Sequence, residues 1–199
     1  MTLPTTELAP GLPICDFTAF GGTGDLALRK LLPALYQRER EGQLPAGNQR
    51  GGAEILVGAG TILTPDHAEQ ARAAGARFLV SPGATPTLLR SMADTGLPYL
   101  PGTATVSEVL AVLEAGVREM KFFPAEAPGG TAFLSAIASP VPAARFCPTG
   151  GITEANAAAY LSLPNVGCVG GSWLTPADAV RGGDWARLAR LAREAAALR

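Results

Sequence analysis

The sequence predicts an α/β fold, a (β/α) TIM-type barrel that is incomplete at about seven strand–helix units. From residue 54 onward, short apolar runs alternate with segments of helical pattern, at a spacing of roughly 20–25 residues. The predicted strands are apolar almost throughout, as parallel strands buried on both faces are. Several end in glycine or proline, which is typical of the strand ends that build the binding loops of a barrel.

The units follow one another in order along the chain. In the first, the strand EILVGAG precedes a helix with Thr64 as N-cap and Pro65 at its first position. The third helix begins where Thr105 and Glu108 have capping-box spacing. The other predicted strands are FLVSPG, PYLPG, REMKFFP, ARFCPTGG and VGCVGGS, and the last helix is the amphipathic DWARLARLAREAAAL. A strand and helix within residues 16–47 would supply the seventh unit, one short of closure.

Paired glycines follow the last two predicted strands. Loops in that position commonly bind phosphate in barrels, because the backbone N–H groups there can approach an anion closely. This favours a barrel over a doubly wound sheet, although tight turns alone would also explain such glycines. The pairs are Gly150 with Gly151 and Gly170 with Gly171; Gly58, Gly60, Pro82 and Gly83 end earlier strands.

Composition narrows the possible functions. The 199 residues are 47% hydrophobic and 17% charged, with a net charge of −1, which favours one well-packed domain and neither a nucleic-acid nor a membrane partner. The N-terminus lacks the pattern of a signal peptide, so we expect a cytoplasmic protein. The three cysteines have no metal-ligand spacing and are expected to be reduced thiols. We expect the one histidine, His67, to be solvated, which argues against a histidine metal site.

Lys121 stands in a short apolar run and is one of only two lysines, the other being Lys30. Strand alternation places it on one face with Phe123, and Met120 and Phe122 on the other. If Lys121 points into the barrel, burial lowers its pKa, and a neutral amine can form a Schiff base with a ketone. The alternative is a lysine whose stem packs on phenylalanine while its head pairs with a carboxylate such as Glu126.

From Gly58 to about Leu198 the chain resembles 2-keto-3-deoxy-6-phosphogluconate (KDPG) aldolase, an enzyme of the Entner–Doudoroff pathway of carbohydrate metabolism. The resemblance implies a carbon–carbon lyase with a β/α barrel, a homotrimer that needs no metal or organic cofactor. Its ligand would be a phosphorylated 2-keto acid. The matching motifs are VGAGTIL, FLVSPG, PGTATVSE, KFFPAEAPGG, RFCPTGGIT and GGSWL.

The same resemblance implies roles for individual residues. Lys121 would be the catalytic Schiff-base lysine. Substrate would be bound by Thr61, Pro82, Phe123 and Thr149, and its phosphate by Gly150, Gly151, Gly170, Gly171 and Ser172.

The start of the chain departs from this family. The family carries a strand like Leu-Glu-Val-Thr-Leu-Arg, whose glutamate moves protons and whose arginine grips the substrate carboxylate, and no such run is present here. Residues 16–47 instead resemble the start of glucose-6-phosphate dehydrogenase, with Gly21, Gly22, Gly24 and Lys30 on its phosphate-loop motif. A dinucleotide site needs further strands, which do not follow, so no NADP site is expected.

The predicted organisation therefore has three parts: a loosely ordered N-terminus (1–15), a strand, glycine-rich turn and helix (16–47), and the aldolase barrel portion (54–199). The predicted function is class I cleavage of KDPG to pyruvate and glyceraldehyde 3-phosphate. We expect the activity to be impaired by the missing glutamate and arginine. The alternatives are a catalytically inactive phosphate-binding remnant, and a chain that barely folds because apolar strand faces are uncovered.

Overall fold

In the computed structural model, residues 58–198 can be described, and they alternate between strands and helices as predicted. The divisions predicted at 1–15 and 16–47 lie outside these residues and stay predictions. The strands are β1 (Leu79–Val80), β2 (Tyr99–Leu100), β3 (Gly102–Thr103), β4 (Glu119–Phe122) and β5 (Arg145–Pro148). The helices are α2 (Pro65–Ala73), α3 (Pro86–Asp94), α4 (Val106–Glu114), α5 (Gly130–Ala138), α6 (Glu154–Leu161), α7 (Ala177–Gly182) and α8 (Trp185–Ala196), with a short 3-10 helix η2 (Ser172–Leu174).

All strand pairings within residues 58–198 are parallel and follow the order of the chain. β1 pairs with β2, and β3 pairs with β4, which pairs with β5. Isolated bridges extend the series at both ends, from Ala59 to Leu79 and from Phe146 to Val166. This is the strand order of a β/α barrel, and it confirms the predicted fold class. With β2 and β3 counted as one segment, because one residue separates them, six successive strand segments fall in the described residues. The seventh predicted unit lies outside them.

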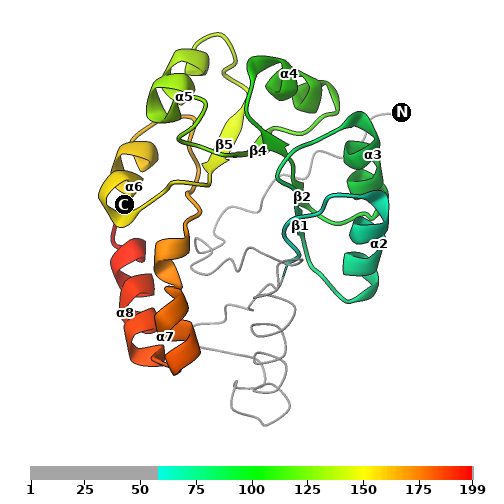
Figure 1. Ribbon diagram of the computed structural model, residues 1–199. Helices are drawn as coiled ribbons and strands as arrows, with labels where there is room; N and C mark the ends of the chain where they lie inside the picture. The colour runs from blue at the N-terminus through cyan, green and yellow to red at the C-terminus, as the bar shows by residue number, and fades with distance from the viewer. Residues whose placement is uncertain (1–57, 199) are drawn as a thin grey trace.

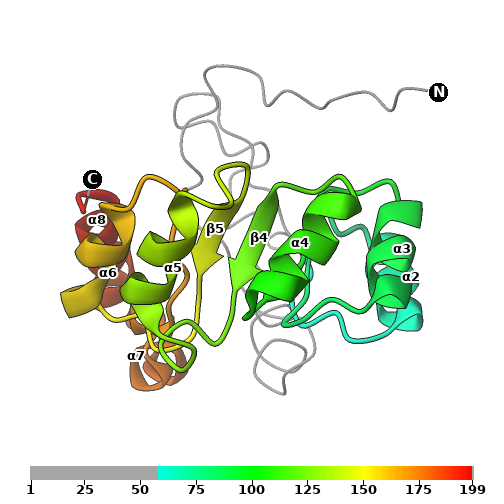
Figure 2. The ribbon, with the colours of Figure 1, turned by 90° about the horizontal axis from the view of Figure 1, so that it is seen from above.

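The helices follow one another around the outside of the strands, from α2 to α8 (Figure 1). Seen from above, α4 and α5 lie along the same side of β4 and β5 (Figure 2). The core fills the layer between helices and strands. Phe122 of β4 stacks on Phe133 of α5 with ring centroids 5.0 Å apart, and it meets Phe146 of β5 edge-on at 6.2 Å. One face of β4 therefore anchors the helical layer and leaves the other face for Lys121.

The helices begin where local residues predict. Thr64 caps α2 by accepting a hydrogen bond from the His67 amide, with Pro65 at the first position. Thr105 and Glu108 form the complete capping box of α4. These contacts involve residues within four positions of each other, so they need no tertiary partner. Each helix is thereby started just beyond the end of the strand before it.

The expectation of a solvated His67 is wrong. The residue is half-buried, and its Nδ1 is enclosed without a hydrogen-bond partner from residues 58–198. Helix α2 packs against α3, and Ala68, the residue next to His67, is fully buried. Within residues 58–198, no helix is long and apolar enough to cross a membrane.

Candidate active site

Lys121 lies in the middle of the described strands, on β4. Its register partners are Gly102 on β3 and Cys147 on β5, and its amide donates to the carbonyl of Pro101 at 2.9 Å. Lys121 is 8% exposed, and it is the only charged residue that is buried within residues 58–198. A Cβ on Gly102 would lie 2.2 Å from the carbonyl carbon of Pro82, so the backbone after β1 packs directly against this glycine.

Burial lowers the pKa of the Lys121 ammonium, because the charged form loses hydration. The charge of an ionised Cys147 acts in the opposite direction and raises that pKa, but burial is the larger effect. The Nζ lies 4.3 Å from the centroid of the Phe123 ring, which confirms that these two side chains share a face. The site thus holds an amine that loses its proton more readily than an exposed lysine does.

Glu126 is not the partner of Lys121. Its carboxylate accepts hydrogen bonds from the Tyr160 hydroxyl and, at 3.5 Å, from Nδ2 of Asn156. None of the ion pairs formed between residues 58 and 198 includes Lys121. The alternative of a lysine neutralised by Glu126 is therefore excluded, and the amine faces no carboxylate from the described part of the chain.

The register places the predicted substrate residues at one end of the parallel strands. Thr61 follows the bridge residue Ala59 by two positions, and Pro82 follows β1 by two. Phe123 directly follows β4, where its amide donates to Thr103 at 3.0 Å. Because parallel strands all point the same way, residues just beyond their carboxyl ends meet on one rim.

Thr149 joins this rim to the last strand segment. Its amide donates to Phe122 and its carbonyl accepts from Ala125, both at 2.9 Å, and it bridges Gly170 in parallel. The Thr149 hydroxyl lies 4.0 Å from the Cys147 thiol. Cys147 is in turn the neighbour of Lys121, so Thr149 is one side chain away from the amine.

The turn after β5 requires glycine. Gly150 and Gly151 have φ of 90° and 85°, a region that L-residues rarely adopt. A Cβ on Gly150 would lie 3.0 Å from the Phe123 ring, and one on Gly151 would lie 2.5 Å from Cγ of Glu126. Phe123 and Glu126 therefore pack directly against the backbone of this turn and leave no room for a side chain at either position.

The second glycine pair lies beside the first. The amide of Gly170 donates to Pro148 of β5 at 2.9 Å, and Gly171 leads into η2 at Ser172. The sequence-predicted phosphate residues are thus brought together at the ends of two neighbouring strand segments. Thr61 is the only non-glycine residue between 58 and 198 with a positive φ, 57°, and such strain in a β-branched residue is typical of functional sites.

Sequence reasoning missed three residues that form the walls around Lys121. Cys147 is its register partner. Thr103 is 1% exposed, and its hydroxyl donates to the Lys121 carbonyl at 3.5 Å. Ser81, fully buried, accepts from the Gly102 amide at 3.4 Å. Alternation along β5 places Cys147 and Thr149 on one face of the sheet. Only the pairing register of β4 and β5 shows that Lys121 lies on that same face.

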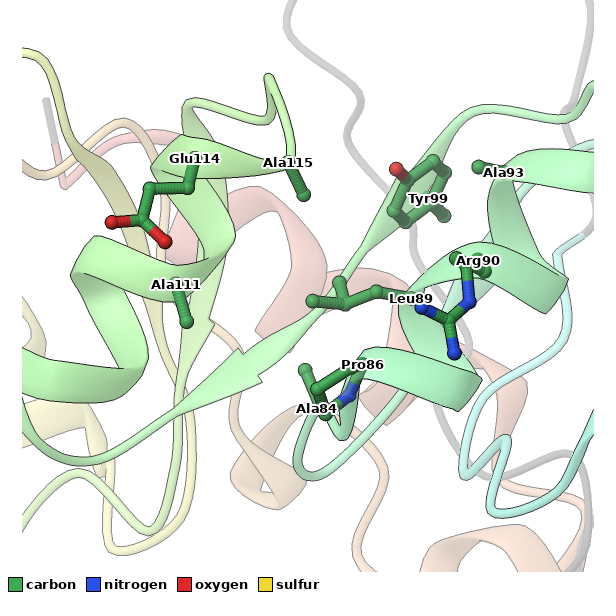
Figure 3. Close-up of a pocket in the computed structure, with 9 residues that line it drawn as sticks. All are labelled: Ala84, Pro86, Leu89, Arg90, Ala93, Tyr99, Ala111, Glu114 and Ala115. Atoms are coloured by element: carbon green, nitrogen blue, oxygen red, sulfur yellow. The ribbon is translucent and has the colours of Figure 1, made fainter.

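A surface groove lies elsewhere. It measures about 390 Å³ and is formed by α3, α4 and the start of β2 on the outer side of the strands (Figure 3). None of the predicted site residues lines it. Among residues 58–198, no group of three His, Cys, Asp or Glu side chains could hold a metal ion.

Fold and site together define a class of protein: an α/β barrel that holds a lysine with a lowered pKa near glycine turns at the carboxyl ends of its strands. A family model described as KDPG and KHG aldolase matches residues 47–191. The KHG/KDPG aldolase of Escherichia coli is 51% identical over 142 residues, covering 71% of this chain and 67% of that protein. The chain belongs to the KDPG and KHG aldolase family.

Solved structures agree. A KDPG aldolase from Legionella pneumophila, with pyruvate captured as a covalent carbinolamine intermediate, superposes with a TM-score of 0.72 at 40% identity, covering 82% of this chain and 75% of that one. The 2-keto-3-deoxy-6-phosphogluconate aldolase of Zymomonas mobilis with 3-phosphoglycerate gives a TM-score of 0.68 at 42% identity, covering 76% and 70%. These likenesses support the barrel assignment across the described residues.

A second family model matches the start of the chain. Residues 18–54 match the NAD binding domain of glucose-6-phosphate dehydrogenase, which confirms the resemblance noted from the glycine motif. The two matched segments overlap over residues 47–54. The chain therefore combines sequence from two families, of which the aldolase covers the larger part.

Proposed function

We propose that this chain is a class I aldolase that cleaves 2-keto-3-deoxy-6-phosphogluconate to pyruvate and glyceraldehyde 3-phosphate. The observation that carries the proposal is the buried Lys121 amine, whose pKa is lowered by burial and which faces no carboxylate within residues 58–198. The names of the relatives specify the substrate class. The protein would act in the cytoplasm, in the Entner–Doudoroff pathway, without a metal or organic cofactor.

Lys121 would act as the nucleophile. Its neutral amine adds to the substrate ketone to give a carbinolamine, which loses water to become a protonated imine. The β-hydroxyl then gives up its proton and becomes the carbonyl of the departing aldehyde, while the bond between the α and β carbons breaks and its electron pair moves to the imine. The remaining enamine takes up a proton, and water releases pyruvate and restores the amine. The carbinolamine captured in the Legionella relative is the first of these species.

The substrate would lie across the rim. Thr61, Pro82 and Phe123 would enclose the pyruvoyl part, and Thr149 would face the hydroxylated carbons. The phosphate would bind to backbone amides of the two glycine turns, at Gly150, Gly151, Gly170, Gly171 and Ser172. Neither the Gly150 amide nor the Gly151 amide donates to another backbone group within residues 58–198, which supports this placement. As in the family, we propose that the protein assembles as a homotrimer.

We also propose that turnover is impaired. The sequence lacks the family's glutamate and arginine run, and Cys147 is the one ionisable neighbour in residues 58–198 that shifts the pKa of Lys121. This observation keeps a second candidate, an inactive phosphate-binding remnant of the same aldolase. In that case the glycine turns still hold an anion, but no group moves protons at the substrate.

Trapping with borohydride tests the proposal. The protein is incubated with pyruvate, reduced, and weighed by mass spectrometry, and the modified peptide is sequenced. The chain has only two lysines, so Lys30→Arg should keep the adduct and Lys121→Arg should abolish it. A coupled assay for release of pyruvate from the substrate then separates an active aldolase from a remnant. No adduct in the unmodified chain would exclude both a reactive Lys121 and the aldolase reaction.

A further inference from the structure

Two thiols lie in the wall of the lysine site, and the proposed reaction uses neither. Cys147 is 3% exposed on β5, beside Lys121, and Cys168 is exposed on the following strand segment. The two are not joined by a disulfide. Their positions relative to each other follow from the way the two strand segments pair.

The pairing contains a one-residue bulge. Phe146 bridges Val166 and Thr149 bridges Gly170, so four positions on the second segment match three on β5. The hydrogen bonds agree: Gly167 donates to Phe146 at 3.0 Å and Gly170 to Pro148 at 2.9 Å, where a regular ladder would use residue 169. Such a bulge sets two residues opposite one and turns a side chain from its regular face.

The bulge places Gly167 and Cys168 opposite Cys147, with Val169 opposite Pro148. In a regular ladder Cys168 would share the face of its neighbour Pro148, away from Cys147. The extra residue instead lets its side chain reach the Cys147 thiol, and the two form a hydrogen bond. That hydrogen bond, together with burial, raises the pKa of Cys147. Of the two thiols, Cys168 is the exposed one and Cys147 the buried one.

We propose that Cys147 and Cys168 form a reversible intramolecular disulfide when the protein meets a hydroperoxide. This is a redox modification site beside Lys121 and goes beyond the proposed aldolase reaction. Exposed Cys168 is the residue that an oxidant reaches, and Cys147 is the buried thiol that resolves the oxidised product.

The reaction balances in two steps. The Cys168 thiolate attacks one oxygen of the peroxide; an S–O bond forms, the O–O bond breaks, and the second oxygen leaves as hydroxide that becomes water. The Cys147 sulfur then attacks Cys168, the S–S bond forms, and the S–O bond breaks with release of a second water. Two thiols are oxidised by two electrons in total, and hydrogen peroxide is reduced to two waters.

The test uses Cys15→Ser as its background, which leaves only this pair of cysteines in the full chain. The protein is treated with a small excess of hydrogen peroxide, denatured and alkylated, then weighed. We expect a chain lighter by two hydrogen atoms that accepts no alkyl group, and recovery of two alkylatable thiols after dithiothreitol. No step depends on aldol turnover, so failure here leaves the proposed function standing, and the reverse also holds.

The sequence allows the linkage to be located. Trypsin releases residues 146–181 as a single peptide that contains both cysteines, and a glutamate-specific protease cuts it at Glu154. The halves should stay joined after oxidation and separate after reduction. In a matched Cys168→Ser variant, Cys147 should lose its thiol at least about tenfold more slowly, because it is buried.

Three results would overturn the proposal. One is oxidation of Cys168 to a sulfinic acid while Cys147 still accepts an alkyl group. Another is a disulfide found only between two chains. The third is loss of the Cys147 thiol at the same rate in the Cys168→Ser variant as in the background protein, which would show direct oxidation of each thiol.

Discussion

Burial of Lys121 lowers the stability of the folded chain, and the same burial lowers its pKa as the proposed reaction requires. Because burial lowers its pKa, the folded chain holds the ammonium proton more weakly than the unfolded chain does. Between the lowered value and the ordinary value of 10.5, the unfolded state binds the proton and the folded state does not, so this group makes stability rise with pH across that window. Below the window both states are protonated, and the folded state bears the full cost of the buried charge.

Lys121→Met should therefore stabilise the protein at neutral pH. Methionine keeps an apolar stem without the charge, and we expect the free energy of unfolding in urea to rise by roughly 0.5–2 kcal/mol. The gain should shrink as the pH approaches 10.5. Arg118→Met, at an exposed position just before β4, serves as the control and should change little. A gain that stays constant with pH would show that burial of charge is not its cause.

Tyr160 has no role in the proposed reaction, but it contacts Glu126 beside the turn after β5. Its side chain is 1% exposed, and its hydroxyl donates to the Glu126 carboxylate; burial, with that hydrogen bond second, raises the pKa of Tyr160. Tyr160→Phe leaves the carboxylate with only the weaker contact to Asn156. We expect urea unfolding to report a loss of about 1.5–3 kcal/mol, the range for hydrogen bonds to charged groups.

Glu126→Gln is the comparison for that change. The amide keeps an oxygen that can accept from Tyr160, so this variant should lose less stability than Tyr160→Phe does. Equal losses in the two variants would mean that the negative charge, not the hydroxyl, carries the interaction. An unchanged Tyr160→Phe protein would rule out a stabilising role for the contact.

At the scale of the element, the turn after β5 can be tested against another turn of the same backbone geometry. Gly151 and Gly116 have φ of 85° and 84°, but only at Gly151 would a Cβ meet a neighbour, at 2.5 Å from Glu126. Gly116→Ala should cost about 1–2 kcal/mol from backbone strain alone. Gly151→Ala should cost more and also weaken competitive inhibition by inorganic phosphate, whereas Gly116→Ala should leave that inhibition unchanged. Equal stability losses would contradict the predicted steric clash.

The elements themselves were largely predictable, because their signals are local. Thr64 and Thr105 mark helix starts through contacts within three residues, and the alternating apolar runs mark the strands. The side-chain neighbours that strand pairing creates could not be predicted from the sequence. Cys147 lies beside Lys121 only in the observed register, and Cys168 reaches it only through a bulge. Glu126 finds its partner 34 residues away, which alternation cannot show.

At the scale of the whole molecule, parallel strands in chain order gather residues that are far apart in sequence. Thr61, Phe123 and Thr149 lie on one rim because each follows the carboxyl end of a strand segment, and all these segments run in the same direction. The sequence motif predicted those residues, and the fold explains why they meet. The amine and the two glycine turns thus lie at one end of the strands described.

This arrangement separates two parts of the proposed reaction. Imine formation needs a neutral amine and an accessible ketone, whereas C–C cleavage and release of pyruvate also need protons moved at the substrate. The family's glutamate and arginine run is missing from this sequence. General acid–base groups typically contribute about 10²–10⁴-fold, so we expect turnover to fall by that order relative to a complete member of the family.

Trapping and turnover should therefore diverge when this chain and the Escherichia coli relative are assayed side by side. A borohydride adduct should form in both proteins, on Lys121 in this chain, while pyruvate release from the substrate should be about 10²–10⁴-fold slower here. Adding acetate or formate as an external proton carrier should restore part of the rate, because it replaces the missing carboxylate without affecting the amine. Turnover equal to that of the relative would mean that another group of this chain already moves the proton, and Cys147, next to Lys121, would be the first residue to substitute.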